Sequence, residues 1–241
     1  MKRPKFFVGL HHPNHAASFD RCMISVNRLE RRKSDFQVGE WILDSGAFTR
    51  ITTGLGHMPV GQYTDQIQRW KRCGSLVAAV SQDWMCEPFV REITGLSIEA
   101  HQGLTIDRFD ELTGCGVYIM PVLQGYAPQE YASHLEMYGD RLRDGAWVGV
   151  GSICRRNGSP REVEAVLRAI SQVRPDLRLH GFGLKKLALR SDIVTRLLWS
   201  CDSMAWSYAA RRAGRNANSV SEAVRYVKQI AAQPIQFSLD L

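Results

Sequence analysis

The sequence predicts an α/β protein of the TIM-type (β/α)8 barrel class, and three observations support this prediction. Apolar stretches of strand length alternate with amphipathic stretches of helix length along the chain, which is typical of parallel βα units. Acidic or amide side chains directly follow several of the apolar stretches, as they do where parallel strands carry functional groups to one face. The 241 residues suit a single barrel domain over residues 1–241 with one sizeable core.

Seven stretches have the apolar composition and the bounding turn residues of strands. They cover residues 5–10, 41–44, 76–83, 117–125, 147–151, 177–183 and 197–202. An eighth strand is either supplied by residues 235–239 or degenerate. The sequence therefore predicts a barrel whose closure depends on its C-terminal end.

Amphipathic stretches between these strands have apolar residues at spacings of three and four, which favours helices. We expect helices at residues 18–33, 60–73, 128–138, 159–173 and 220–232, and one that ends near residue 196. The first of these rests on the spacing of Phe19, Met23 and Val26. Residues 49–59 contain two glycines and are expected to form a loop, which is either a substrate flap or a simple connector.

Four polar residues stand at the ends of predicted strands: Asp44, Asp83, Gln124 and Asp202. Taken singly, a carboxylate in such a place more often caps a loop or a helix. Together at one barrel mouth, one carboxylate can attack an anomeric carbon while another exchanges protons with the leaving and arriving groups. The nucleophile must be ionised, and the pKa of its partner must be raised by burial or like charge.

The net charge of +7 indicates a polyanionic partner, because excess Lys and Arg concentrate nucleic acid around a protein. Basic residues that follow predicted strand ends are expected to surround the mouth and contact a nucleic acid. They are Arg155, Arg156, Lys185, Lys186, Arg211, Arg212 and Arg215.

The cysteines and histidines predict neither a metal site nor a cofactor. None of the six cysteines forms a C-x-C or C-x-x-C pair, so reduced thiols in the cytoplasm are the simplest interpretation. His11, His12 and His15 are close in sequence, but Pro13 prevents helical pairing of His11 with His15, and no nearby carboxylate or cysteine completes a ligand set. The apolar runs are too short to span a bilayer, so we expect no membrane contact.

Six short segments occur in a fixed order between residue 41 and about residue 206. They read LDSGAF at 43–48, SQD at 81–83, VLQG at 122–125, VGVG at 148–151, HGFG at 180–183 and CDSM at 201–204. Each piece is short, but the ordered set is specific. It resembles the queuine tRNA-ribosyltransferase (tRNA-guanine transglycosylase) superfamily.

This resemblance implies a TIM-type barrel and a base-exchange reaction. Guanine in a polynucleotide would be replaced by a free 7-deazaguanine such as preQ0, through a covalent aspartyl intermediate. By the same resemblance, Asp202 is the nucleophile on C1′ and Asp44 is the acid/base residue beside the leaving base. A flipped guanine presents donors at N1 and N2 that carboxylates accept well, which agrees with this chemistry.

The resemblance also implies a set of substrate-binding residues. Asp83 and Gln124 would read the base edge, and Gly151 would bring backbone amides to the exocyclic carbonyl. Phe48 and His180 occupy positions whose side chains sandwich the base in the superfamily. The remaining substrate-binding positions in the matching motifs are Ser45, Gly125, Gly149 and Gly181.

Departures from the tRNA enzymes point to a particular branch of the superfamily. No cysteine follows Asp202, so the Cys-x-Cys-x-x-Cys and His zinc element of those enzymes is missing. The chain is also shorter than those enzymes, and Ala47 stands where many have glycine. The pattern resembles the 7-deazaguanine DNA transglycosylases of bacterial and viral DNA modification. We therefore expect DNA rather than tRNA as the substrate, in the cytoplasm of a bacterium or of the host of a virus.

Three alternatives stay open from the sequence. A tRNA-guanine transglycosylase would have the same catalytic residues but act on tRNA. A retaining glycosidase would share paired carboxylates on a barrel, although no glutamate ends a predicted strand to serve as its acid. A non-catalytic nucleic-acid-binding barrel would keep the charge without the chemistry.

Overall fold

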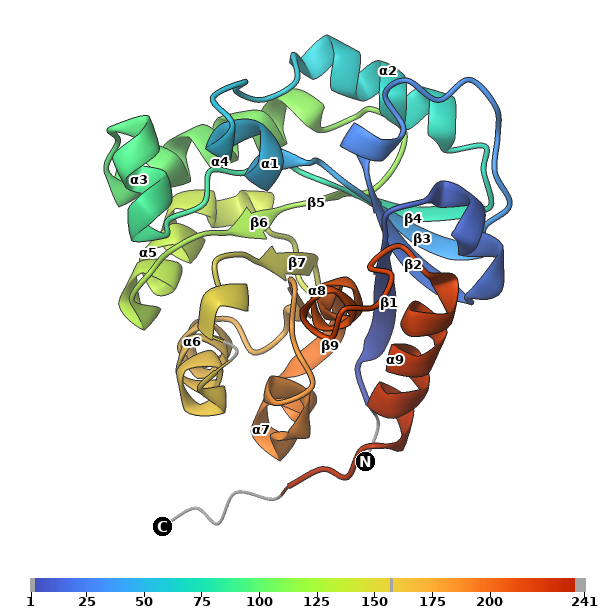
Figure 1. Cartoon of the computed structure of the whole chain (residues 1–241). Helices are drawn as coiled ribbons and strands as arrows, with labels where there is room; N and C mark the ends of the chain where they lie inside the picture. The colour runs from blue at the N-terminus through green and yellow to red at the C-terminus, as the bar shows by residue number, and fades with distance from the viewer. Residues whose placement is uncertain (1–2, 157, 237–241) are drawn as a thin grey trace.

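Parallel strands surround a central axis, and helices cover their outer side, in the computed structural model (Figure 1). The structure describes residues 3–156 and 158–236. All pairings between neighbouring strands are parallel. The strands are β1 (Lys5–Leu10), β2 (Arg21–Ser25), β3 (Glu40–Asp44), β4 (Ser75–Val80), β5 (Ile119–Met120), β6 (Val122–Leu123), β7 (Trp147–Val150), β8 (Arg178–Gly181) and β9 (Leu198–Ser203). The TIM-type α/β class is confirmed.

Helices occupy most of the connections between strands. They are α1 (Ala47–Thr52), α2 (Val60–Trp70), α3 (Pro88–Thr94), α4 (Ile98–Leu112), α5 (Pro128–Tyr138), α6 (Pro160–Val173), α7 (Asp192–Leu197), α8 (Ala205–Arg212) and α9 (Val220–Ala232). Pro128 and Pro160 open α5 and α6 at a position where a missing N–H costs nothing. In α2, Tyr63, Ile67 and Trp70 lie on one buried face. The predicted helices at 128–138 and 220–232 are confirmed with the same bounds.

The barrel closes through a strand that Pro121 divides into β5 and β6. The strand order is β5-β4-β3-β2-β1-β9-β8-β7-β6, so the two ends of the sheet are consecutive segments of the chain. Proline has no N–H to continue a ladder, but its carbonyl still accepts a hydrogen bond from the Gly149 N–H at 2.8 Å. With β5 and β6 counted as one interrupted strand, eight strands complete the barrel.

The prediction of a helix at residues 18–33 is wrong, because this segment contains β2. Cys22 and Ile24 face the outer helices, whereas Met23 faces the barrel interior. Both faces of a barrel strand are buried, so the strand is an unbroken apolar run whose spacing can imitate a helix. β2 also supplies the strand that was expected from residues 235–239. In that segment Gln236 forms an isolated bridge with Ser191, and residues 237–239 lie outside the described residues.

The segment at 49–59 is only partly a loop. Its first four residues belong to α1, which begins directly after Gly46, and the loop occupies residues 53–59. Gly46 has φ +70°, and a Cβ atom there would lie 2.3 Å from the Asn27 amide nitrogen. The tight turn from β3 into α1 therefore needs glycine at this position.

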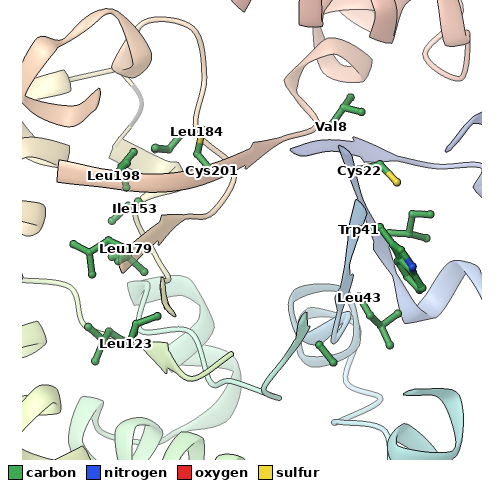
Figure 2. Packing of buried hydrophobic residues seen from close by; sticks show 14 of the residues in the cluster. Val8, Cys22, Trp41, Leu43, Leu123, Ile153, Leu179, Leu184, Leu198 and Cys201 are labelled. Atoms are coloured by element: carbon green, nitrogen blue, oxygen red, sulfur yellow. The ribbon is translucent and has the colours of Figure 1, made fainter. Parts of the chain in front are cut away.

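Alternate residues of each strand face opposite sides, and this alternation positions the polar residues. Outward-facing side chains such as Val8, Trp41 and Leu123 pack between the strands and the helices (Figure 2). Inward-facing side chains form a separate interior cluster that includes Ile42 and Val122. Asp44 and Gln124 come two residues after these, so they share the inward face at the carboxyl end of the barrel.

Candidate active site

A cavity of about 570 Å³ opens at the carboxyl ends of the strands. Four residues predicted from strand ends line it together: Asp44, Asp83, Gln124 and Asp202. They come from β3, from the segment after β4, from the segment after β6, and from β9. Carboxylates that are up to 158 residues apart in sequence thus face one space.

Asp202 is held at the base of this cavity by its neighbours. Its Oδ1 accepts a hydrogen bond from the Gly183 N–H at 2.9 Å and lies 3.4 Å from Nε2 of His180. The residue is 8% exposed, and it borders the cavity. One oxygen of Asp202 is therefore fixed by the protein.

The environment of Asp44 favours its protonated form. Burial raises the pKa of Asp44 to about 6, and the charge of Asp202 adds to the rise. Hydrogen bonds from Ser25 and from the Gly46 N–H, the latter at 3.2 Å, oppose this pKa shift. A carboxyl group with a pKa near neutrality can give and take a proton at cellular pH.

Asp83 and Gln124 form a pair on the adjoining wall. Nε2 of Gln124 donates a hydrogen bond to Oδ2 of Asp83. Burial raises the pKa of Asp83 to about 7; the Gln124 hydrogen bond opposes the rise, and the charge of Asp44 adds to it. The Gln124 backbone is fixed as well, because its N–H donates to His134 Nδ1 at 2.9 Å and its carbonyl accepts from Gln102 at 2.7 Å.

Ser152 extends this pair into a buried polar chain. Its hydroxyl lies 2.7 Å from Gln124 Oε1 and 2.9 Å from Glu87 Oε2, and it accepts the Cys86 N–H at 3.2 Å. Its φ of 56° is the only positive value for a non-glycine among the described residues. Such a conformation costs about 1–3 kcal/mol and is typical of functional sites, and here it directs the hydroxyl at Gln124.

Five other predicted substrate-binding residues do not border the cavity. They are Ser45, Gly125, Gly149, His180 and Gly181. A Cβ atom on Gly149 would lie 2.3 Å from the Phe182 ring, and it is Phe182 that borders the cavity. Gly149 is therefore needed for packing.

Gly151 borders the cavity but does not offer its own amide. Its N–H donates to the Leu123 carbonyl at 2.9 Å within the sheet. A Cβ atom at this position would lie 2.2 Å from Nε2 of Gln124, so glycine is required to make room for that side chain. The G-x-G pattern thus reflects the packing of Phe182 and Gln124.

Phe48 lies at the rim of the cavity with an aromatic and a cationic neighbour. Its side chain is 47% exposed, and its ring centroid is 6.2 Å from that of Phe89. The Arg155 guanidinium lies 4.6 Å from the Phe89 ring centroid and 6.0 Å from that of Phe48. These groups form an exposed surface on which a base can stack.

The seven predicted nucleic-acid contacts differ in their surroundings. Arg155 lies at the rim, and Arg211 is close enough to His11 for its charge to lower the pKa of that histidine. Lys185 lies 5.8 Å from the ring centroid of the exposed Tyr208 on α8.

Three other basic residues on that list have protein partners. Arg156 bonds to the Tyr126 carbonyl, Lys186 to Gln229 at 2.7 Å, and Arg215 to Glu222 at 2.8 Å. Arg212 is exposed near the end of α8.

Sequence reasoning missed several residues that border the cavity. They are Asn27, Arg28, Glu87, Ser152, Cys154, Phe182 and Met204, with others of the lining. Arg28 follows β2, whose apolar spacing predicts a helix. Its guanidinium lies 3.3 Å from Nδ1 of His11, which in turn contacts Ser207 at 2.8 Å through Nε2. Correct recognition of β2 would have placed Arg28 at a strand end.

Within the part of the chain that the structure describes, no group of three or more His, Cys, Asp or Glu side chains could hold a metal ion. Burial, followed by the charge of Arg28, lowers the pKa of His11 to about 4. His12 and His15 lie edge-on with ring centroids 5.2 Å apart. All six cysteines are free thiols, and no described helix is long and apolar enough to cross a membrane.

Comparison with known proteins identifies the family of the chain. A search of curated proteins found no match. A family model described as "DpdA: DeoxyPurine in DNA protein A" matches residues 1–233. The members of this family are tRNA-guanine transglycosylase-like 7-deazaguanine DNA transglycosylases, which confirms the resemblance seen in the ordered motifs. With nearly all of its length matched, the chain belongs to the DpdA family of DNA-acting transglycosylases.

Proposed function

We propose that the protein replaces guanine in DNA by a free 7-deazaguanine such as preQ0, through an ester between Asp202 and C1′ of the deoxyribose. The observation that carries the proposal is the unlike environment of two carboxyl groups in one cavity. Asp202 has one oxygen bound by a backbone N–H, whereas burial raises the pKa of Asp44 to about 6. Such a difference suits a nucleophile and a proton donor.

In the first half of the reaction, Asp202 attacks C1′ and the bond from C1′ to N9 of guanine breaks. The electron pair of that bond stays with the base, and the proton held by Asp44 neutralises it. The products are a glycosyl ester on Asp202, free guanine and an ionised Asp44. The nearby charge of Asp202 disappears in this step, which makes ionisation of Asp44 easier.

In the second half, N9 of the incoming 7-deazaguanine attacks C1′. The bond from C1′ to the Asp202 oxygen breaks, and Asp202 leaves as a carboxylate. The N9 proton passes to Asp44, which restores both carboxyl groups to their starting states. Because each half uses the same two residues in reverse roles, no further reactant is required.

Recognition of the base is assigned to the opposite wall and the rim. The carboxyl oxygens of Asp83 and the amide oxygen of Gln124 would accept hydrogen bonds from the N1–H and N2–H donors of guanine. The target base must leave the duplex before its C1′ can meet Asp202 inside the cavity. The exposed Phe48 at the rim offers a surface on which the extruded base can stack. Arg155, Lys185 and Arg211 with Arg28 would meet backbone phosphates around the opening.

The test is incorporation of label into a polymer. The purified protein is incubated with radiolabelled guanine and, in separate reactions, with duplex DNA and with tRNA. We expect label in DNA, and release of that label when preQ0 is added. Label in tRNA alone would make the protein a tRNA enzyme, and binding of DNA with no label would leave a non-catalytic barrel. The second base, 7-aminomethyl-7-deazaguanine, is tested in the same chase.

A further inference from the structure

His180 is a buried titratable residue that the reaction above does not use. Its side chain is fully buried at the end of β8, inside the barrel and below the cavity. The rings of Phe7, Trp147 and Phe182 surround it, with centroids at 6.1, 5.9 and 4.8 Å. Because Phe182 and Asp202 border the cavity while His180 does not, the imidazole cannot stack on a base in this arrangement.

The hydrogen bonds around His180 determine which ring nitrogen carries the proton. Trp147 Nε1 lies 2.7 Å from Ser200 Oγ, and this indole N–H can only donate. Ser200 Oγ lies 2.8 Å from Nδ1 of His180. The Ser200 oxygen could accept a second hydrogen bond, but Nδ1 is the acceptor that the described contacts offer to its O–H, so we assign the hydroxyl as the donor to Nδ1. Nδ1 is then the acceptor, and a neutral imidazole carries its proton on Nε2.

The Nε2 atom of His180 has one polar neighbour of consequence. It lies 3.4 Å from Oδ1 of Asp202 and makes no hydrogen bond of good geometry to another described group. The opposite tautomer would place a lone pair of Nε2 against a carboxylate oxygen, which is repulsive. Trp147 thus donates to Ser200, Ser200 donates to His180, and the Nε2–H of His180 points toward Oδ1 of Asp202. The Gly183 N–H binds this same oxygen.

We propose that His180, oriented by Ser200 and Trp147, is a positioning residue that stabilises the Asp202 carboxylate when it leaves C1′. The inference rests on the proposed function. At 3.4 Å the contact is long, and catalytic hydrogen bonds commonly shorten once substrate is bound. His180 touches Asp202 and not the reacting base, so it acts through the nucleophile.

This role affects the two halves of the reaction unequally. Asp202 is a carboxylate before the first half and a neutral ester after it, so a donor on Oδ1 does not speed the attack. In the second half the ester oxygen becomes a carboxylate again, and a donor on Oδ1 stabilises that developing charge. Loss of the donor should therefore slow consumption of the covalent adduct and leave its formation unchanged or faster.

Two amide substitutions at the same buried position separate this role from packing. His180→Gln can place an amide nitrogen near the position of Nε2, whereas His180→Asn can reach only the position of Nδ1. With trapped adduct mixed with incoming base, we expect His180→Asn to slow adduct consumption roughly 10- to 100-fold, the range for one hydrogen bond to a charged group. His180→Gln should consume adduct within a few-fold of the wild-type rate.

Ser200→Ala provides a test that leaves the imidazole in place. It removes the donor that holds Nδ1, so it should slow adduct consumption in the same direction by a smaller ratio than His180→Asn. Thermal unfolding shows which variants are folded. If neither His180 variant folds, the rate of adduct consumption in Ser200→Ala tests the inference by itself. Equal slowing of both half-reactions in the folded variants, or adduct consumption at the wild-type rate in Ser200→Ala and His180→Asn, would overturn the inference. Failure of the wild type to form adduct would instead contradict the proposed function.

Discussion

Two cavities of similar size lie at opposite ends of the barrel, and they differ in chemistry. The cavity at the carboxyl ends of the strands, about 570 Å³, has four acidic residues in its lining, of which Asp44, Asp83 and Asp202 belong to the candidate site. The cavity at the amino ends, about 610 Å³, is bordered mainly by aliphatic and basic side chains, many of them from β1 and α9. Volume alone would favour the second. The two cavities are distinguished by the convergence of polar groups, which the direction of the strands produces at the carboxyl end alone.

Among substitutions in the two cavities, Asp202→Asn should cause the largest loss of base-exchange activity. The variant keeps the size of the side chain but has no nucleophile, so the covalent adduct should disappear and exchange should fall on the order of 10⁶-fold. Denaturing gel electrophoresis with labelled DNA measures the adduct. Persistence of the adduct would move the nucleophile to Asp44, the other carboxylate placed to reach C1′.

Asp44→Asn should cause a smaller loss of activity. The nucleophile remains, but the proton for the leaving base is missing, and general acid–base help is typically worth ~10²–10⁴-fold. We expect adduct to form slowly rather than not at all. A rate as low as that of Asp202→Asn in a single-turnover assay would show that the two residues do not have separate roles.

The pH dependence of stability should also distinguish Asp44. Burial raises its pKa to about 6, from an ordinary 3.8. The folded state thus binds the Asp44 proton more tightly than the unfolded state does. The contribution of this protonation to folding stability is complete below pH 3.8 and is lost as the pH rises through 6. The free energy of unfolding of Asp44→Asn, relative to wild type, should increase over this range by up to about 3 kcal/mol. Urea unfolding at several pH values measures the difference, and parallel curves would contradict it.

In the amino-end cavity a substitution should affect stability alone. Ile230 is 7% exposed on α9 and borders that cavity. Ile230→Ala should lower the free energy of unfolding by about 2 kcal/mol, at the low end for a buried aliphatic residue that already borders a cavity. Exchange activity of the folded variant should be unchanged. A selective loss of activity would mean that both ends of the barrel take part in function.

The smallest expected effect concerns charge at the rim. Arg28 borders the reactive cavity beside the neutral His11, whereas Arg215 is held by Glu222. Arg28→Ala should weaken DNA binding roughly fivefold and lower the salt dependence by about one counterion. Arg215→Ala, the matched control, should change neither. Fluorescence anisotropy across a salt series measures both, and equal effects would remove Arg28 from the binding surface.

Sequence reasoning placed the candidate carboxylates together because Asp44 and Asp202 lie at the carboxyl ends of buried strands and Asp83 follows another. Asp44, Asp83 and Asp202 needed only the direction of the strands and the alternation of their side chains. It failed at β2, whose two buried faces remove the alternation that distinguishes a strand. It did not foresee that Gly149 makes room for the Phe182 ring, because this packing depends on contacts between distant segments.

The sequence did not predict the buried polar chain around Gln124, for a related reason. Ser152 and Glu87 follow strands through loops, and loop side chains have no periodicity that reveals their direction. Ser152 adopts a left-handed backbone that its residue type disfavours. A sequence pattern therefore predicts which strands deliver groups to the mouth, and it does not predict how loops connect those groups.

Pro121 makes one joint of the barrel wall weaker than the others. β5 pairs with β4 through two residue pairs, and β6 pairs with β7 through two, whereas β2 and β3 share five. Short ladders open more readily, so amide hydrogens on either side of Pro121 should exchange earlier than those of β1 and β3. The bond from Gln124 to Asp83 spans this same joint. A base bound to both Asp83 and Gln124 would link the two sides of this joint. Its binding should therefore slow amide exchange on either side of Pro121.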